Sequence, residues 1–435
     1  MDTKLGATAT PTRDFLESLF RAAVAAAHPA NCLPQNLPEP PPRGRLIILA
    51  AGKAAGAMTE VAERHYIPLL PVEKLAGLAV TRHGYGRPTR RIPVIEAGHP
   101  VPDKAGISAT KRALALADAV EGEDLVLVLL SGGASANWIA PALGLTLEEK
   151  QVVTRALLES GAAIGEINTV RKHLSRIKGG RLAKRAFPAS LLTLAISDVP
   201  GDDPAVIGSG PTVPDPTTLA DARDIVSRYR LALPAAATRV LNDPANETPK
   251  PGDDVFAATD YRIVARPTEA LRAAAERAAA AGYECITLGG RLQGEAREIA
   301  AEHAGFVREL SNQGRRAAVL SGGELTVTLR GNGQGGPNQE YALALAIHLD
   351  GVPGIAALAA DTDGTDGGGG RPDDPAGAFV DQTTLQRARS AGLDPAAFLA
   401  DNNSTGFFKG IGGLFRPGPT FTNVTDFRAI VVDRP

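Results

Sequence analysis

The stretch LIILAAGKAAGAM, residues 46–58, joins an apolar run to a glycine turn and to the start of a second apolar pattern. Its first six residues predict a buried strand, Gly52 predicts a tight turn, and the spacing from Ala54 onward predicts a helix. Lys53 lies in that turn, so its ammonium and the first N–H groups of the helix are suited to one phosphate. An exposed lysine beside a turn is the alternative interpretation. A Walker A motif is excluded, because Ala54 replaces the required Ser or Thr.

Strand and helix patterns alternate on both sides of this stretch. In the first half, strands are predicted over 75–80, 92–98 and 125–130, and helices over 12–27, 104–120, 146–164 and 219–231. In the second half, strands are predicted over 261–265, 283–290, 317–323, 324–330 and 355–361, and helices over 267–281, 294–312 and 339–348. This alternation predicts an α/β protein with parallel strands and crossover helices.

The loosest segment of the chain, NDPANETPKPGDD at 242–254, separates the two halves. We therefore predict two domains, residues 1–240 and 255–435, which also suits a chain of 435 residues. The runs LVLVLLSGGAS and RAAVLSGGEL are alike, and we interpret them as the same exit from a strand into a loop rather than as a true repeat.

Composition excludes several classes of protein. A hydrophobic fraction of 44% with 22% charged residues is typical of a globular chain with a sizeable core. The net charge of -2, without a basic patch among aromatic residues, argues against nucleic-acid binding. Cys32 and Cys285 stand outside any CxxC motif, and no apolar run reaches the length of about eighteen residues that a membrane helix needs. We expect a cytoplasmic protein that associates with neither nucleic acid nor membrane.

The segment ISDVPGDDPAVIGSGPTVPDPTT, residues 196–218, follows a short buried strand pattern and is too rich in Asp, Gly and Pro for regular structure. Open α/β sheets bind ligands where strands end, so Asp198, Asp202 and Asp203 are candidates for holding a cation near phosphate. Turn formation by Asp, Gly and Pro is the alternative. Asp198 stands nearest to the strand end, and we expect it to face the site.

Glycines 331, 333 and 336 satisfy the pattern GxGxxG between a predicted strand and a predicted helix, which is the context of a dinucleotide fingerprint. Pro337 inside the turn and the displaced position of Asp361 weaken that interpretation. The more general expectation is that the helix start binds an anion through its N–H groups. A glycine-rich hairpin without a ligand is the alternative.

Further polar residues cluster in two short stretches. The acids of ADTDGTDGGGG (360–370) do not form a calcium loop, because the twelfth position counted from Asp361 is Pro372 rather than Glu. Asp361 and Asp363 remain candidates for ligating magnesium or accepting a proton. The run 167–183 holds Arg171, Lys172, His173, Arg176 and Lys178, which form either a solvated helix face or a site for a carboxylate or phosphate.

His99 has no second histidine three or four residues away, which argues against a zinc site. The nucleophile elbow GxSxG is absent from the sequence.

The chain resembles the glycerate 2-kinases of the MOFRL type, whose members are often labelled hydroxypyruvate reductase. The resemblance runs from about Phe15 to Val432 and depends on motifs that occur in one order. They are GKAAGAM (52–58), GHPVPD (98–103), LLSGGASA (129–136), NTVRKHLSRIKGGRLA (168–183), the 196–218 segment, SGGELTV (321–327), GGPNQEYALALA (335–346), DTDGTDG (361–367) and GPTFTNVTD (418–426). The chain departs from the pattern at Phe421, where glycine is expected, and at Pro337, where some members have Arg.

The resemblance implies a Rossmann-like N-terminal domain with a parallel sheet and a smaller α/β MOFRL domain, with the active site in the cleft between them. It implies ATP- and Mg2+-dependent phosphorylation of D-glycerate to 2-phosphoglycerate, and it is compatible with a homodimer. An NAD(P)H-dependent hydroxypyruvate reductase and a non-catalytic nucleotide or sugar-acid binding protein are the alternatives.

On this interpretation, the catalytic residues are Lys53, Asp198 and Asp363, with Asp198 and Asp361 as magnesium ligands and His99, Arg171 and Lys178 as glycerate contacts. The nucleotide contacts are Ser131, Gly132, Gly133, Ala134, Ser135, Gly322, Gly323, Glu324, Gly335 and Asn338.

Overall fold

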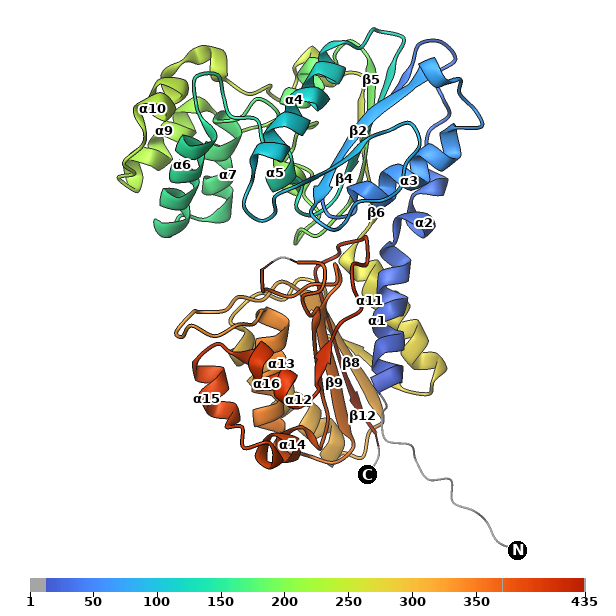
Figure 1. Cartoon of the computed structure of the whole chain (residues 1–435), viewed down its shortest axis with the longest axis vertical. Coiled ribbons are helices and arrows are strands. Elements are labelled where there is room, and N and C mark those ends of the chain that lie inside the picture. Colours follow the sequence, from blue (N-terminus) through green and yellow to red (C-terminus); the bar gives the residue numbers. More distant parts are fainter. Residues whose placement is uncertain (1–12, 370, 434–435) are drawn as a thin grey trace, which may run out of the picture. The chain divides into compact units, whose positions relative to one another are not determined.

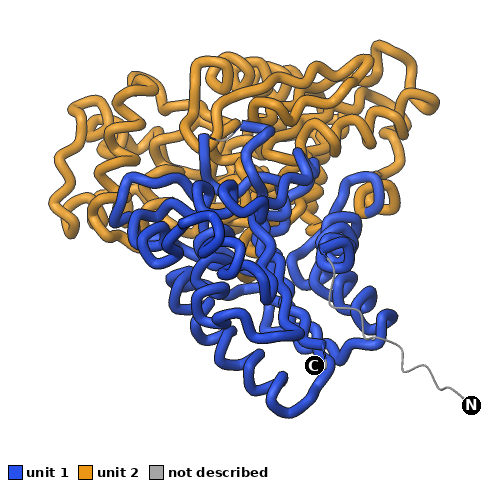
Figure 2. Tube along the Cα trace, turned by 60° about the horizontal axis from the view of Figure 1, so that its bottom comes forward, with its two compact units in different colours: residues 1–31, 265–435 blue, residues 32–264 orange. Residues whose placement is uncertain are grey.

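The computed structural model describes residues 13–369 and 371–433. Residues 32–264 form one compact unit, called unit 2 in Figure 2, and the described residues before and after them form unit 1. This differs from the predicted division at 1–240 and 255–435 in two ways. Helix α1 (Arg13–Ala27) packs along α11 (Pro267–Ala280) and so belongs with the C-terminal half, and the first sheet includes a strand at Thr259–Ala265, beyond the predicted boundary.

Unit 2 is built on a six-stranded sheet in the order β3-β2-β1-β4-β5-β6 (Figure 1). The pairs β2–β3, β1–β2, β1–β4 and β4–β5 are all parallel, so the predicted parallel sheet is confirmed. The strand order reverses between β1 and β4, which in open α/β sheets is where ligands bind. The strands are β1 (Leu46–Ala51), β2 (Leu75–Arg82), β3 (Val94–Ala97), β4 (Leu125–Leu130), β5 (Ser190–Ile196) and β6 (Thr259–Ala265).

Helices cover this sheet, and buried apolar side chains on both faces explain the continuous apolar runs of β1 and β4. A separate group, α6, α7, α9 and α10, has its own apolar core (Figure 1). The helices of unit 2 are α3 (Ala55–Tyr66), α4 (Lys104–Asp118), α5 (Ala134–Asn137), α6 (Leu147–Glu159), α7 (Ile164–His173), α8 (Arg181–Ala186), α9 (Leu219–Arg228) and α10 (Ala235–Asn242), and the short α2 (Pro29–Cys32) spans the boundary between the two units. Short 3-10 turns lie at η1 (Pro34–Asn36), η2 (Val72–Lys74), η3 (Ile207–Ser209), η4 (Pro244–Asn246) and η5 (Asp254–Phe256).

Unit 1 holds a second six-stranded sheet in the order β11-β10-β9-β12-β8-β7. This sheet is mixed: β7 and β8 are parallel, whereas β12 runs antiparallel to both β8 and β9. As a result, β8 and β9 end at the edge where β12 begins. The strands are β7 (Glu284–Thr287), β8 (Ala317–Gly323), β9 (Ile355–Asp361), β10 (Gly377–Val380), β11 (Leu414–Phe415) and β12 (Asp426–Val432).

The helices of unit 1 lie on both faces of its sheet, with α1 and α11 on one face and α12 and α13 on the other (Figure 1). Burial of α13 on nearly all sides explains why its sequence, PNQEYALALAIHL, lacks an apolar stripe. The remaining helices are α12 (Ala296–Asn312), α13 (Pro337–Leu349), α14 (Thr384–Ser390), α15 (Pro395–Ala400) and α16 (Ser404–Gly410). Among the described residues, no helix combines the length and apolarity that crossing a membrane requires.

The strand predicted over residues 324–330 is wrong. Within this segment, only Thr326 forms a β-bridge, to Glu295. The N–H group of Thr328, two residues further on, donates to the Glu295 carboxylate instead of to a neighbouring strand, so the pairing does not continue. The GxGxxG glycines therefore do not follow a strand, which removes the context that the dinucleotide fingerprint requires.

Candidate functional site

Lys53 lies at the strand-order reversal of unit 2, directly after β1. The preceding Gly52 has φ +119°, and a Cβ at that position would lie 2.3 Å from the Ser131 Oγ atom, so the turn requires glycine. The Lys53 N–H group donates to the Gly132 carbonyl at 2.7 Å, which fixes the turn after β1 against the turn after β4. The predicted strand, turn and helix at 46–58 are confirmed.

The Ser131–Ser135 turn follows β4 beside Lys53. Ser131 is fully buried, and its Oγ accepts the Ala54 N–H at 2.9 Å, so this side chain caps the start of α3 rather than presenting its hydroxyl to a nucleotide. Within the described residues, the N–H groups of Gly132 and Gly133 donate to no protein acceptor. Adjacent unpaired N–H groups beside a lysine are suited to phosphate oxygens.

His99 reaches the same place from the loop after β3. Gly133 has φ +84°, and a Cβ there would lie 2.9 Å from the His99 Cδ2 atom and 3.3 Å from the Lys53 Cγ atom. His99, Lys53 and Gly133 are thus neighbours although they are far apart in sequence. The structure brings together these residues as predicted for one site, at the carboxyl ends of parallel strands.

The basic residues of the 167–183 run have different environments. Lys172 pairs with Asp215, His173 with Glu247, and the Arg176 guanidinium donates to the Pro141 carbonyl. Arg171 and Lys178, by contrast, have no carboxylate partner among the described residues. The Lys178 ammonium is 1% exposed and donates to the Ser135 carbonyl at 2.9 Å.

Burial lowers the pKa of Lys178 well below its ordinary value, and the charges of Arg171 and Lys150 lower it further. Lys150 and Lys178 are buried and Arg171 is half-buried, so these three basic residues form a group beside the Ser131–Ser135 turn that is largely shielded from solvent. Such a group is suited to an anionic ligand, because a ligand carboxylate or phosphate would offset the repulsion.

Asp198 follows β5, next to β4, and so shares the edge of the sheet with Lys53. It is partly exposed and lies near Tyr261, since burial and then the charges of Asp198 and Asp203 raise the pKa of that phenol. Asp203, in contrast, accepts the Ala205 N–H at 2.8 Å, and Asp202 has φ +58°, as expected for residues that form turns. Of the three acids in the 196–218 segment, Asp198 is the best placed for chemistry.

In unit 1, the predicted nucleotide glycines after β8 already have protein partners. The Gly322 N–H donates to the Gly289 carbonyl at 2.9 Å, and the Gly323 N–H donates to the Thr425 hydroxyl at 3.3 Å. Glu324 is exposed. Gly322 and Gly323, predicted as nucleotide contacts, therefore use their N–H groups within the protein, although their sequence resembles that of the Ser131–Ser135 turn.

The start of α13 is occupied by a carboxylate of the protein itself. Asp366 accepts the N–H groups of Asn338 and Gln339 at 3.1 and 2.9 Å, together with their side-chain amides. Burial and then the charge of Asp426 raise the pKa of Asp366 to about 7, against the lowering effect of these donors. Asn338 is fully buried and also donates to Asp426, so the anion expected at this helix start is Asp366 rather than a nucleotide phosphate.

The glycines of the 331–336 turn serve close packing. A Cβ at Gly331, Gly333 or Gly335 would lie within 2.4 Å of residues in the 401–404 segment, and one at Gly336 would lie 2.4 Å from Asp366. The turn is glycine-rich because other parts of unit 1 lie so close to its backbone that a side chain would not fit. Close packing therefore explains why residue 335 is glycine, and the dinucleotide interpretation of the GxGxxG motif is not supported.

Replacing Asp366 with alanine is expected to lower the free energy of unfolding by about 2–4 kcal/mol, because buried donors lose their acceptor. Asp394 is a matched control, since it is an exposed carboxylate that caps α15. Asp394→Ala should cost only about 1 kcal/mol. Chemical denaturation of both variants measures the difference, and equal losses would show that the Asp366 network adds nothing beyond an ordinary cap.

Asp361 and Asp363 lie where β9 ends. Asp361 is partly exposed, and one of its carboxylate oxygens accepts the Asp363 N–H at 2.8 Å. Asp363 is 1% exposed and accepts the Thr365 N–H and hydroxyl at 2.7 and 3.0 Å. The described residues contain no group of three or more metal-ligating side chains. Magnesium commonly binds through one or two carboxylates and phosphate oxygens, a role that suits the partly exposed Asp198 and Asp361.

Comparison with known proteins connects both units to one family. Residues 15–242 match a domain of unknown function, DUF4147, and residues 317–426 match the MOFRL family. A D-glycerate 2-kinase from Thermotoga maritima is 39% identical over 94% of this chain and 95% of its own length. The chain belongs to the MOFRL family of glycerate kinases.

Two further comparisons concern a relative that is named as a reductase and a relative whose structure has been solved. A protein of Agrobacterium vitis that is 48% identical, over 97% of this chain and 94% of its own length, is named putative hydroxypyruvate reductase. The crystal structure of a glycerate kinase from Thermotoga maritima matches with a TM-score of 0.84 and 37% identity, covering 96% of this chain and 99% of that one.

Two site features of this MOFRL protein escaped the sequence interpretation. Lys150 on α6 is buried near Arg171 and Lys178, and Asp366 occupies the start of α13. The sequence signal for Lys150 was weak, because a lysine within LEEKQVV usually lies on an exposed helix face. Asp366 lies in the acidic stretch 360–370, where the sequence gives no sign that its carboxylate caps a helix.

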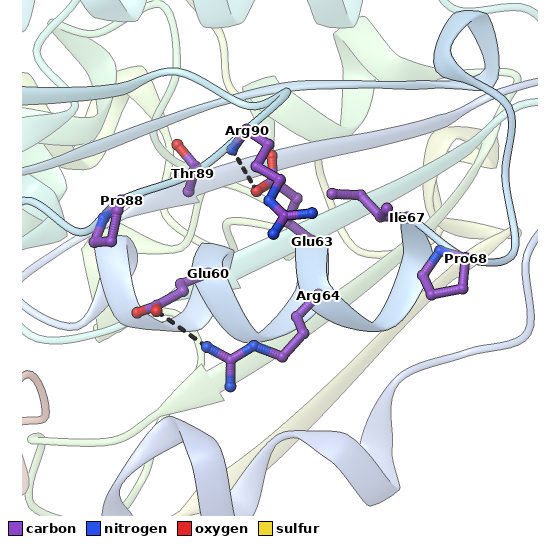
Figure 3. Close-up of a pocket in the computed structure, with 8 residues that line it drawn as sticks. All are labelled: Glu60, Glu63, Arg64, Ile67, Pro68, Pro88, Thr89 and Arg90. Carbon is purple, nitrogen blue, oxygen red and sulfur yellow. Dashed lines mark hydrogen bonds and ion pairs between the residues drawn. The ribbon is translucent and has the colours of Figure 1, made fainter.

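A pocket of about 490 Å³ lies along α3 and the loop at 88–90 (Figure 3). Its acids are paired within the wall: Glu63 accepts the Arg90 N–H at 2.6 Å, and Glu60 pairs with Arg64 at 3.1 Å. None of the predicted site residues lines this pocket, so it is not the candidate site.

Proposed function

We propose that this protein transfers the γ-phosphoryl group of ATP to the 2-hydroxyl of D-glycerate, giving ADP and 2-phosphoglycerate. The observation that carries the proposal is the grouping of Lys53 with the unpaired N–H groups of Gly132 and Gly133 at the strand-order reversal. Phosphoryl transfer needs positioning and positive charge around the γ-phosphate more than it needs covalent chemistry from the protein. The names of the MOFRL relatives support glycerate as the acceptor.

In this proposal, the nucleotide phosphates accept hydrogen bonds from Gly132 and Gly133, and the Lys53 ammonium neutralises charge that develops on the γ-phosphoryl group. The glycerate 2-hydroxyl oxygen forms a bond to the γ-phosphorus, the bond to the β-phosphate oxygen breaks, and the hydroxyl proton passes to a carboxylate. Asp198 is favoured over Asp363 for that role, because Asp363 is buried and already accepts two hydrogen bonds. Magnesium, held by Asp198 or Asp361 with phosphate oxygens, would supply further neutralisation of phosphate charge.

The glycerate carboxylate is assigned to Arg171 and Lys178, which have no acidic partner among the described residues and lie beside the Ser131–Ser135 turn. His99, adjacent to Lys53 and Gly133, is placed to contact the acceptor or the transferred phosphoryl group. A reductase is less well supported, because the GxGxxG glycines pack against residues 401–404 and Asp366.

The test is incubation with D-glycerate and Mg-ATP and, separately, with hydroxypyruvate and NADH or NADPH. ADP should form in the first reaction. The product should be converted directly by enolase, which accepts 2-phosphoglycerate but not 3-phosphoglycerate. Loss of absorbance at about 340 nm without ADP formation would instead favour the reductase, and no reaction in either mixture would favour a binding protein.

A further inference from the structure

A pocket of about 430 Å³ lies beside the Ser131–Ser135 turn in unit 2. Ser135, Lys150 and Arg171 line it, together with apolar side chains that include Val101, Ile139, Leu147 and Leu158. Lys178 is buried behind Ser135, to whose carbonyl it donates. The pocket therefore combines a strongly cationic end with apolar walls.

The cations of this pocket have few partners of their own. The Lys150 side chain is buried, with the residue 4% exposed, and its ammonium donates to the Leu174 carbonyl at 2.7 Å. The Arg171 guanidinium makes one hydrogen bond within the described part of the chain, to the Asn168 amide oxygen at 3.4 Å. Among the described residues, no carboxylate pairs with Lys150, Arg171 or Lys178. An ammonium has three donors, so Lys150 keeps donors beyond the one that Leu174 satisfies.

A buried cationic group without an acid is costly, because desolvation and mutual repulsion are not offset by any partner charge. We propose that Lys150 and Arg171, with the charge of Lys178 buried behind Ser135, form a subsite that receives the carboxylate of a small organic acid, with Lys150 as a substrate-binding residue. That this acid is the phosphoryl acceptor, glycerate, rests on the proposed function; the carboxylate subsite itself does not.

The pocket suits a carboxylate better than a nucleotide phosphate chain. Its walls are apolar apart from the cationic end and a few polar side chains, so it fits a molecule with one charged end. The unpaired N–H groups of Gly132 and Gly133, beside Lys53, already offer a separate place for phosphate oxygens. The two places are adjacent through Ser135, which is the arrangement that an acceptor and a phosphoryl donor require.

Carboxylate binding at this subsite should depend on pH. Burial and then the charges of Arg171 and Arg181 lower the pKa of Lys150 to about 7. The charged groups that act on Lys150 are therefore Arg171 on α7 and Arg181 on α8, with Lys178 as a further neighbour. A bound carboxylate would raise this pKa, so binding favours the protonated lysine. Affinity should be greatest below pH 7 and should fall as the pH rises and Lys150 loses its proton.

The experiment measures the dissociation constant of D-glycerate without nucleotide, by calorimetry at about pH 6 and about pH 9. Lys150→Met should weaken binding by ~10- to 100-fold at the lower pH and reduce the pH dependence to the part that Lys178 contributes. Lys111→Met is the matched control, since Lys111 is exposed on α4 and its loss should change neither quantity. Lys150→Arg should bind glycerate at both pH values. Glycerol, which lacks the carboxylate, should bind much more weakly than glycerate.

Thermal unfolding separates this role from a structural one. Methionine matches the volume of lysine without a buried charge, so Lys150→Met should unfold at the wild-type temperature or above. A glycerate dissociation constant unchanged by Lys150→Met would overturn the proposal, and so would a loss of ATP affinity without a loss of glycerate affinity. If Lys150→Met loses glycerate binding but the wild-type protein forms no ADP, the subsite stands and the kinase function fails.

Discussion

Replacing Lys53 with methionine is expected to lower kcat for ADP formation by about 10²- to 10³-fold. Lys53 lies beside the unpaired N–H groups of Gly132 and Gly133, and the proposed partner of its ammonium is charge that appears on the phosphoryl group during transfer. A group that acts mainly in the transition state affects kcat more than KM. Steady-state kinetics with D-glycerate and Mg-ATP measures both constants.

The fold should tolerate this change. The backbone N–H group of residue 53, which methionine retains, makes the bond to Gly132. The melting temperature of Lys53→Met should therefore stay close to that of the wild type, and Lys111→Met provides the surface control for both activity and stability. Wild-type turnover by Lys53→Met would show that Lys53 has no part in phosphoryl transfer.

Gly133→Ala is expected to reduce kcat/KM by about 10²-fold, because its Cβ would displace the groups that the site holds together. The methyl group would lie 2.9 Å from the His99 Cδ2 atom and 3.0 Å from the His99 Nε2 atom, so the imidazole must shift. Lys53 is also within contact range, and the φ of +84° is unfavourable for alanine.

Gly144→Ala is the control that separates two effects of Gly133→Ala, the backbone strain and the displacement of the site residues. Gly144 has φ +80°, close to that of Gly133, and a Cβ there would meet no atom within 4 Å. Both variants should lose about 1 kcal/mol of stability from the left-handed conformation, but only Gly133→Ala should lose activity. Equal kcat/KM values for the two variants would contradict the proposed grouping of Lys53, His99 and Gly133.

Much of unit 2 could be predicted from the sequence, because its candidate site residues directly follow strands or precede helices. A buried strand that ends in a glycine turn places Lys53 at the carboxyl edge of a parallel sheet. The same reasoning correctly predicted that Asp198 and the Ser131–Ser135 turn lie at this edge. The 324–330 strand was wrong because a side chain, Glu295, took the N–H group that a neighbouring strand would have used. Sequence periodicity contains no information about such a competitor.

The basic residues of unit 2 show a second limit of prediction from the sequence. The basic residues of 167–183 look equivalent in the sequence, yet acids from distant positions pair with Lys172 and His173 and not with Arg171 or Lys178. Lys150 joins them from another helix. Whether a cation is part of a solvated face or of a binding site depends on burial and on its partners, and both are set by packing.

The sequence by itself determined the α/β class, the strand, turn and helix around Lys53, and the family, because these depend on local spacing and on the order of motifs. Only the tertiary structure decided which glycine turn has unpaired N–H groups. LSGGAS and LSGGEL both follow a buried strand, but Gly289 and Thr425 supply acceptors to the second turn, whereas the first turn has none within the described residues. Hydrogen-bond acceptors far away in sequence make that difference, so no local pattern could reveal it.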